Sequence, residues 1–272
     1  MKIYVGSAIW RSVEVGHMKS LVPLLRTPGV QYAPQTGDAL IERARGISAT
    51  HFLRESDADV HLSIDSDITG FTVEDTLKLC SLAMDYDIVA AAYVTRSADK
   101  AFPTAYYEQD VRVNHAFDHT PVEIKWAATG FLAVHRRVFE TLAKDLTLLH
   151  ASEPWAFYNF YGPTEYQDDE TEPILLSEDY AFCQRAKDAG FKVYLDPAVR
   201  IGHIGSYVYR LEDTAQKQIE PQPIALTRTG KKRWTVESIE MPAAGNKTAT
   251  HPRSVDEPLK VAASRDRRLI RA

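Results

Sequence analysis

The stretch that decides the fold runs from Asp59 to Asp67 and reads DVHLSIDSD. Val60, Leu62 and Ile64 alternate with other side chains, which is typical of a β-strand with at least one buried face. The apolar residues stop at the triplet Asp65-Ser66-Asp67. The stretch therefore predicts a buried strand that carries two carboxylates at its end.

Strand-like and helix-like segments alternate on both sides of this stretch. Residues 2–7 read as a first strand that runs into a Gly/Ser loop, and residues 38–55 place apolar residues close to helical spacing. Thr72, with Asp75 three residues later, predicts a capped helix that reaches about residue 84. Residues 87–94 (DIVAAAYV) are a continuous apolar run, as in a central strand covered on both faces. We expect an α/β fold with a mainly parallel sheet, helices on both sides, and ligands at the carboxyl ends of the strands.

The second half of the chain is less regular. Residues 155–173 combine aromatics, prolines and acids without helical or strand period, which suggests a functional loop near an acceptor site. Residues 177–189 predict a helix ended by Gly190, followed by a strand over residues 191–195. Beyond about residue 213 the text is polar and interrupted by prolines, so we expect an extended or partly disordered tail.

Composition limits the class of protein. The 272 residues are 44% hydrophobic and 25% charged, which is ordinary for a globular chain and leaves room for one large α/β domain with an appendage. No window is apolar enough for a membrane span, and the start lacks a signal-peptide core, so we expect a soluble, cytoplasmic protein. Cys80 and Cys183 stand apart from other metal-binding residues, which favours two buried apolar thiols over a disulfide framework or a zinc site.

Charge is distributed unevenly along the chain. Residues 214–272 hold 12 Lys and Arg against 6 Asp and Glu, a net charge of +6. The total of −5 therefore leaves −11 for residues 1–213. The main part of the chain is acidic and its C-terminal part is basic.

Three clusters are candidates for chemistry. Asp65 and Asp67 repel each other unless a cation lies beside them, which points to Mg²⁺ or Mn²⁺, although two acids at a strand end also fit a solvated turn. In the segment Leu176–Tyr180, Ser177 fits a helix N-cap, and its two acids fit either a favourable helix dipole or a positioned general base. His203 lies between Gly202 and Gly205, where it fits either a structural histidine or a side chain close to a ligand.

These clusters occur in this order, with the segment Trp126–Phe131 (WAATGF) between the first and the second. In this arrangement the chain resembles the GT-A nucleotide-sugar glycosyltransferases over about residues 2–209. The resemblance implies a Rossmann-like, nucleotide-sugar-binding half over about residues 1–100 and an acceptor and catalytic half over about residues 101–213. Residues 214–272 would form a basic extension.

The resemblance also implies roles for single residues. Asp67 would be the principal metal ligand, with Asp65 and His203 completing the set around Mn²⁺ or Mg²⁺. Asp179 matches the catalytic base of the inverting members, and Glu178 would orient it. The donor-binding residues would be Asp65, Ser66, Asp67, Arg45, Gly6 and Ser7. For Arg45, on an arginine-bearing helix, solvation at the surface is an equally good interpretation.

The implied reaction moves a sugar from a nucleoside-diphosphate sugar to an acceptor hydroxyl, with a UDP-sugar favoured and inversion preferred. The chain departs from the commonest family layout at residues 29–38, a short segment where a second strand and a base-reading Asp usually lie, so the nucleoside base stays open. The acceptor is a carbohydrate or, by similarity to phage and viral members, a hydroxymethylated DNA base. A magnesium-dependent nucleotidylyltransferase and a non-catalytic sugar- or nucleotide-binding module are the alternatives. Neither a GxxxxGK[ST] nor a GxGxxG phosphate loop occurs in the sequence.

Overall fold

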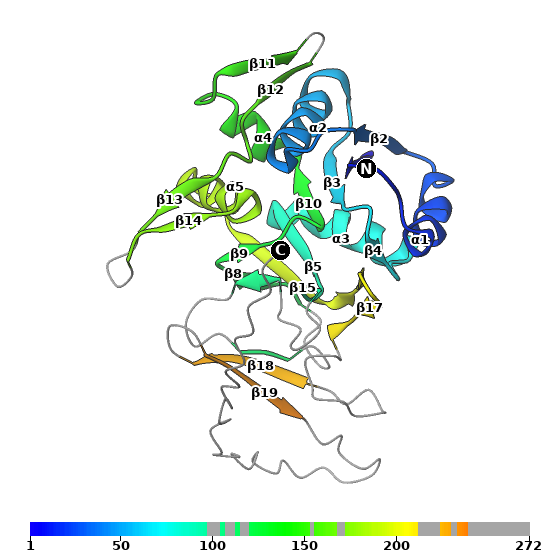
Figure 1. Cartoon of the computed structure of the whole chain (residues 1–272), viewed down its shortest axis with the longest axis vertical. Coiled ribbons are helices and arrows are strands. Elements are labelled where there is room, and N and C mark those ends of the chain that lie inside the picture. Colours follow the sequence, from blue (N-terminus) through cyan, green and yellow to red (C-terminus); the bar gives the residue numbers. More distant parts are fainter. Residues whose placement is uncertain are drawn as a thin grey trace, which may run out of the picture.

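The computed structural model describes residues 1–96, 104–106, 112–114, 120–152, 155–167, 172–211, 224–229 and 233–238. Its centre is a seven-stranded sheet in the order β2-β1-β3-β10-β5-β15-β8 (Figure 1). The strands of this sheet are β1 (Ile3–Ile9), β2 (Val30–Thr36), β3 (Val60–Ile64), β5 (Ile88–Ala92), β8 (Val122–Ile124), β10 (Phe131–His135) and β15 (Val193–Arg200). The helices are α1 (Val15–Leu25), α2 (Ile41–Glu55), α3 (Val73–Tyr86), α4 (Arg136–Leu142) and α5 (Glu178–Asp188).

Smaller sheets and hairpins surround this centre. β16 pairs with β4 and β17, β11 with β12, β13 with β14, β6 with β9, and β18 with β7 and β19. Their bounds are β4 (Ile68–Thr69), β6 (Ala105–Tyr106), β7 (Arg112–Asn114), β9 (Trp126–Ala127), β11 (Leu148–Ser152), β12 (Trp155–Tyr158), β13 (Thr164–Tyr166), β14 (Ile174–Leu176), β16 (Gly202–Ile204), β17 (Val208–Tyr209), β18 (Ile224–Thr229) and β19 (Arg233–Ser238).

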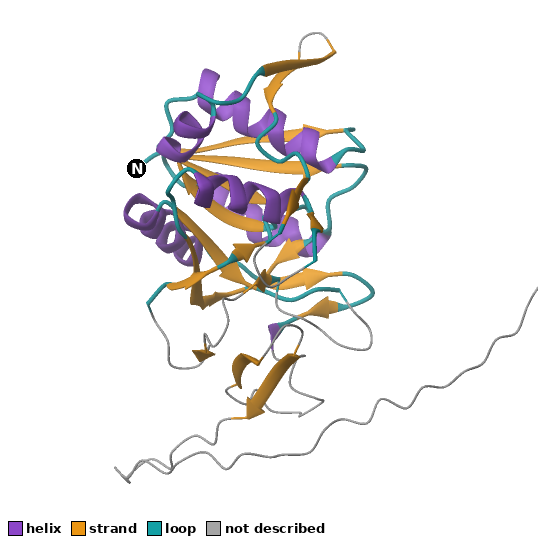
Figure 2. Cartoon of the chain, turned by 90° about the vertical axis from the view of Figure 1, so that its left-hand side faces the viewer, coloured by secondary structure: helices purple, strands orange, loops and turns teal. Residues whose placement is uncertain are grey.

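The direction of the strands confirms a mainly parallel sheet. β2, β1, β3, β5 and β15 run the same way, whereas β10 and β8 are antiparallel to their neighbours. Helices cover both faces of the sheet, as Figure 2 shows from the side. The predicted α/β fold is therefore confirmed.

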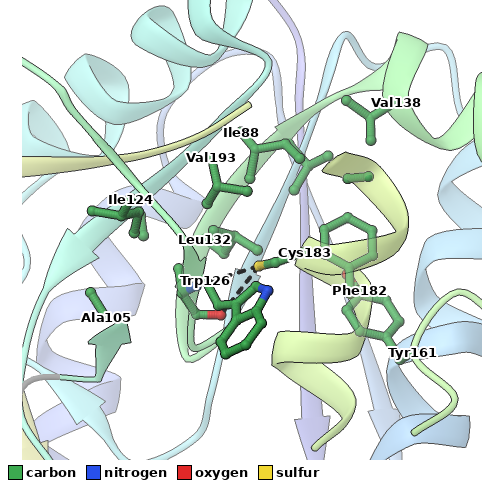
Figure 3. Close-up of a cluster of buried hydrophobic side chains, with 14 of the residues drawn as sticks. Ile88, Ala105, Ile124, Trp126, Leu132, Val138, Tyr161, Phe182, Cys183 and Val193 are labelled. Carbon is green, nitrogen blue, oxygen red and sulfur yellow. Dashed lines mark hydrogen bonds between the residues drawn. The ribbon is translucent and has the colours of Figure 1, made fainter. Parts of the chain in front are cut away.

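Alternation along the strands sorts their side chains into two cores. Tyr4 and Ala90 face the core that holds Phe52, Phe139 and Phe182, so α2, α4 and α5 cover that face. Neighbouring strand residues such as Val5 and Val89 face the other core, with Leu21 of α1 and Leu79 of α3. In Figure 3 the strand residues Leu132 and Val193 are drawn beside Phe182 and Cys183 of α5.

Several local predictions are confirmed. Thr72 and Asp75 form a reciprocal capping box at the start of α3. Helix α5 ends just before Gly190, whose φ of +91° favours glycine. Cys80 and Cys183 are both buried and free. Among the helices of the described residues, none is long and apolar enough to cross a membrane.

One prediction on the second half was wrong. The aromatic-rich segment 155–173, expected to be a loop, contains β12 and β13, and its aromatic residues Phe157, Phe160 and Tyr161 are core residues. Beyond residue 213, where we expected an extended or partly disordered tail, the described residues form the strands β18 and β19, which pair over six residues. Residues 239–272 lie outside the described part of the chain.

The short segment at residues 29–38 does contain a second strand. β2 pairs in parallel with β1 over seven residues and ends the sheet on that side. Pro34 lies within it, which an edge strand tolerates because it needs hydrogen bonds on one side only. Asp38 follows, and its carboxylate accepts two hydrogen bonds of 2.7 Å from Arg43.

Candidate functional site

The triplet Asp65-Ser66-Asp67 forms a turn at the carboxyl end of β3. The Asp65 N–H donates to the Gly130 carbonyl (2.9 Å), and the Ile68 N–H donates to the Asp65 carbonyl (3.1 Å). The Asp67 carbonyl accepts from the Ile204 N–H (2.7 Å), which ties the turn to β16. The Ser66 carbonyl accepts from the Glu14 N–H (3.3 Å). The backbone of the turn is therefore fixed from three directions.

Asp67 and His203 lie side by side. His203 Nδ1 donates to the Val94 carbonyl (2.8 Å), and the other ring nitrogen, Nε2, lies 3.5 Å from Asp67 Oδ2. The guanidinium of Arg96 lies 2.8 Å from the same carboxylate oxygen. Burial acts to raise the pKa of Asp67, but His203 and Arg96 outweigh it and hold the pKa below its usual value. Asp67 is thus a charged carboxylate that lies beside Nε2 of His203.

The spacing of these two atoms suits a shared cation. Neighbouring ligands of an octahedral ion at about 2.1 Å are about 3.0 Å apart, so a small movement from 3.5 Å would bring both into one coordination sphere. Carboxylate oxygen and imidazole nitrogen are both ligands that Mn²⁺ accepts. Asp67 and His203 therefore fit a divalent metal.

Asp65 lies apart from this pair in its interactions. Both of its carboxylate oxygens accept from Arg45 Nη2, at 3.0 and 2.8 Å. Within the described residues, no three His, Cys, Asp or Glu side chains are grouped so as to hold a metal. The metal-binding role of Asp65, and the three-residue ligand set as a whole, stay predictions.

Arg45 joins the triplet to the start of α5. Its Nη1 donates to Glu178 Oε1 at 2.5 Å, across 133 residues of sequence. The side chain is only 8% exposed. Burial acts to lower the pKa of Arg45, but the carboxylates of Asp65 and Glu178 outweigh it and raise the pKa above its usual value. Arg45 is a buried cation between two acids, so the surface interpretation of this residue is wrong.

Glu178 and Asp179 form the first turn of α5, with Ser177 as the predicted N-cap residue. The Ser177 hydroxyl makes no capping bond to the backbone; it donates instead to Asp179 Oδ1, which also accepts from the Tyr180 N–H at 2.8 Å. Burial raises the pKa of Glu178, and Asp179 adds to this against the opposing effect of Arg45. Because Asp179 Oδ1 accepts both hydrogen bonds, the carboxyl group of Asp179 is held through this one oxygen.

Tyr93 and Gly130 are site residues that the sequence did not single out for a role. The Tyr93 hydroxyl accepts from the Gly130 N–H at 2.9 Å. Burial, reinforced by the nearby charges of Asp65 and Asp179, raises the pKa of Tyr93 well above its usual value. A Cβ at Gly130 would lie 2.4 Å from the Tyr93 hydroxyl and 3.3 Å from Asp65 Oδ2. The glycine inside the WAATGF segment was the available sequence signal, because it allows this close approach.

Gly6 and Ser7 are buried in β1. A Cβ at Gly6 would lie 2.2 Å from Ser48 Oγ and 2.7 Å from His61 Nε2, so this glycine lets α2 pack closely on the sheet. Ser7 is fully buried. Their donor-binding roles stay predictions.

No model of a known protein family matches this chain, and no curated protein matches it. Solved structures with a similar arrangement include A197 from STIV, at 14% identity over 91% of this chain and 100% of that chain, with a TM-score of 0.49. S. aureus TarS (residues 1–349) is 11% identical over 72% of this chain and 58% of its own, with a TM-score of 0.40. CMP:2-keto-3-deoxy-manno-octonic acid synthetase complexed with CTP is 12% identical over 72% of this chain and 89% of its own, with a TM-score of 0.35. At such identities, and with TM-scores below 0.5, these likenesses carry no argument about the activity of this chain.

Proposed function

We propose that this chain is a divalent-metal-dependent glycosyltransferase of the GT-A type. It would transfer a sugar from a nucleoside-diphosphate sugar, with a UDP-sugar as the favoured donor, to an acceptor hydroxyl. One observation carries the proposal: Arg45 bridges Asp65, at the end of β3, to Glu178, at the start of α5. Two acidic motifs far apart in sequence thus share one site, as donor binding and general-base catalysis require.

Asp67 and His203 would hold the metal. A Mn²⁺ or Mg²⁺ ion there would supply positive charge against the diphosphate as it leaves. Arg96, next to Asp67 and half exposed, would add a second positive charge on the same side. Because this charge is needed most when the sugar–phosphate bond breaks, it favours the transition state over the bound donor.

Asp179 would remove the proton of the acceptor hydroxyl. Ser177 and the Tyr180 N–H hold its Oδ1, so we assign the proton transfer to Oδ2. General-base help of this kind is typically worth about 10²- to 10⁴-fold in rate. A base that acts on the acceptor while the diphosphate leaves from the opposite face of the sugar gives inversion, which is the outcome we propose.

The first test is the release of UDP. The full chain is incubated with Mn²⁺ and a panel of UDP-, GDP- and CMP-sugars, and the freed nucleotide is measured with and without EDTA. We expect metal-dependent release from one UDP-sugar, which Asp179→Asn reduces. Release of pyrophosphate from a nucleoside triphosphate and a sugar phosphate would instead identify a nucleotidylyltransferase. Binding without any turnover would identify a non-catalytic module.

A second test addresses the acceptor, which we propose to be a carbohydrate or a hydroxymethylated DNA base. The net charge of −11 on residues 1–213 disfavours a polyanion, whereas the +6 on residues 214–272 favours one. Fluorescence anisotropy with plain and hydroxymethylated duplex DNA, at several salt concentrations, separates the two. A lack of DNA binding at low salt would leave the carbohydrate acceptor.

A further inference from the structure

We propose that Arg45 is a positioning residue that holds the donor side and the base side of the site at one fixed spacing. This inference rests on the proposed function and deepens it. It also replaces the expectation that Arg45 binds the donor itself.

The hydrogen bonds of Arg45 are the first argument. Nη2 donates hydrogen bonds to both oxygens of Asp65, at 3.0 and 2.8 Å, and Nη1 donates one to Glu178 Oε1, at 2.5 Å. Both terminal nitrogens of the guanidinium are therefore engaged by protein carboxylates. Among the described residues Nε has no hydrogen-bond partner, but it is itself buried, and the side chain is only 8% exposed. A donor diphosphate would therefore meet a buried cation whose charge two carboxylates already neutralise, with like charges beside it.

The packing of the helix turn that carries Arg45 is the second argument. The next residue, Gly46, lies so close to β12 that a Cβ would be 2.9 Å from the Phe157 ring and 3.1 Å from the Tyr158 carbonyl. Thr50 donates to the Gly46 carbonyl (2.7 Å) and accepts from the Tyr158 N–H (2.8 Å). This turn of α2 is thus clamped against a strand, and the guanidinium extends from a rigid base.

The third argument is the division of roles between the two acids of the triplet. Because Arg45 binds both oxygens of Asp65, this carboxylate is turned toward α2 and α5. Asp67 is left with His203 as the pair that fits a metal. At its other end Arg45 fixes Glu178, whose neighbour Asp179 is the proposed base. One guanidinium thereby sets the orientation of both motifs.

The test compares Arg45→Lys with Arg136→Lys. Lysine keeps the charge at residue 45 but, as a single ammonium, cannot reproduce the fork that spans two carboxylates. Arg136 is a matched control because it also makes several bonds to α2, to the carbonyls of Phe52 and Leu53, at the far end of that helix. Calorimetry measures the Kd of UDP in the presence of Mn²⁺, and steady-state kinetics give kcat and KM for the UDP-sugar that the wild type hydrolyses best.

For Arg45→Lys we expect kcat to fall by at least about thirtyfold while the Kd of UDP changes by less than about threefold. Arg136→Lys should lower the melting temperature and leave kcat within about twofold. Glu178→Gln should lower kcat as well, and the double variant Arg45→Lys/Glu178→Gln should be hardly worse than the poorer single variant, because both changes break one bridge.

Three results would overturn the inference. A loss of UDP affinity as large as the loss of kcat would make Arg45 a donor ligand. Unchanged kcat in Arg45→Lys, or in Glu178→Gln should the first variant not fold, would remove the positioning role. An equal fall of kcat in Arg136→Lys would show that general destabilisation is the cause. A wild-type chain without turnover refutes the proposed function and this inference together, whereas an active wild type with an unaffected Arg45→Lys refutes the inference alone.

Discussion

The contact between Gly130 and Tyr93 allows a sharp prediction for Gly130→Ala. The new methyl group would lie 2.4 Å from the Tyr93 hydroxyl oxygen and 3.0 Å from Cζ of the same ring, far inside normal contact distance. Tyr93 is buried, so the ring has little room to retreat. Overpacking of this kind costs about 1–3 kcal/mol, which for a chain of this size lowers the melting temperature by about 2–12 °C. Because Asp65 Oδ2 is 3.3 Å from the same methyl group, the substitution should also displace Asp65 from its bridge with Arg45 and lower kcat.

The variant Tyr93→Phe supplies the matched background for this test. Removal of the hydroxyl leaves the Gly130 N–H unpaired, which costs about 1–3 kcal/mol, but it also removes the nearer of the two atoms that the methyl group would meet and leaves only Cζ, at 3.0 Å. We therefore expect Gly130→Ala to cost less in the Tyr93→Phe background than in the wild type. Chemical denaturation of the four proteins in the cycle measures this coupling. Equal costs of Gly130→Ala in both backgrounds would refute the steric reasoning.

Three further predictions concern metal, base and pH. Asp67→Ala should abolish Mn²⁺-dependent UDP binding in calorimetry with the fold intact, since it deletes a ligand and no core volume; unchanged affinity would remove the metal assignment. Asp179→Asn should lower turnover by at least about a hundredfold with little change in the Kd of UDP; turnover near that of the wild type would leave Asp179 as a residue of the helix terminus only. Burial lowers the pKa of His61 to about 3 from an ordinary value of 6.5, so the unfolded chain binds the extra proton first as the pH falls. The contribution of His61 to the free energy of unfolding is therefore complete above about pH 6.5 and falls below it, by about 2 kcal/mol at pH 5. Urea unfolding above about pH 6.5 and at about pH 5 should show this loss in the wild type and a smaller loss in His61→Phe.

The local signals in the sequence predicted the elements that lie next to the site. The alternation in β3, the apolar run of β5 and the capping box of α3 are properties of a few neighbouring residues, and all three are confirmed. The same holds for α5, because Ser177 and Gly190 mark its two ends. These elements fix where the acidic motifs begin and end in the fold.

Helix α1 was not predicted because its capping signal and its apolar spacing are weak. Its N-cap, Glu14, makes no capping bond with its side chain, and Pro23 lies inside the last turn. Val15 and Met18 are exposed while Leu21 is buried, so apolar residues occur on both sides of the helix. The buried residues His17, Leu21 and Leu24 do have helical spacing, but the first of them is a histidine, so the exposed apolar residues obscure this period in the sequence.

The direction of β10 and the partners of Arg45 could not be predicted for a different reason. β10 reads as an ordinary apolar strand, and its antiparallel placement between β3 and β5 depends on neighbours far away in sequence. Arg45 is one of two arginines in the segment Glu42–Gly46, and the ion pairs that accompany its burial are made with Asp65 and Glu178 together. The sequence shows that these groups exist, but only the fold shows which of them meet.

The bridge made by Arg45 also sets an order of events during synthesis of the chain. Glu178 follows Arg45 by 133 residues, so at about 5–20 residues per second the ribosome delivers it roughly 7–27 s later. Until Glu178 is synthesised, Asp65 is the one partner of the bridge that Arg45 can bind, and water occupies the position of the Glu178 carboxylate. The bridge is therefore completed only when α5 has been synthesised, and a nascent chain stalled before residue 178 would carry Arg45 and the Asp65-Ser66-Asp67 triplet without it.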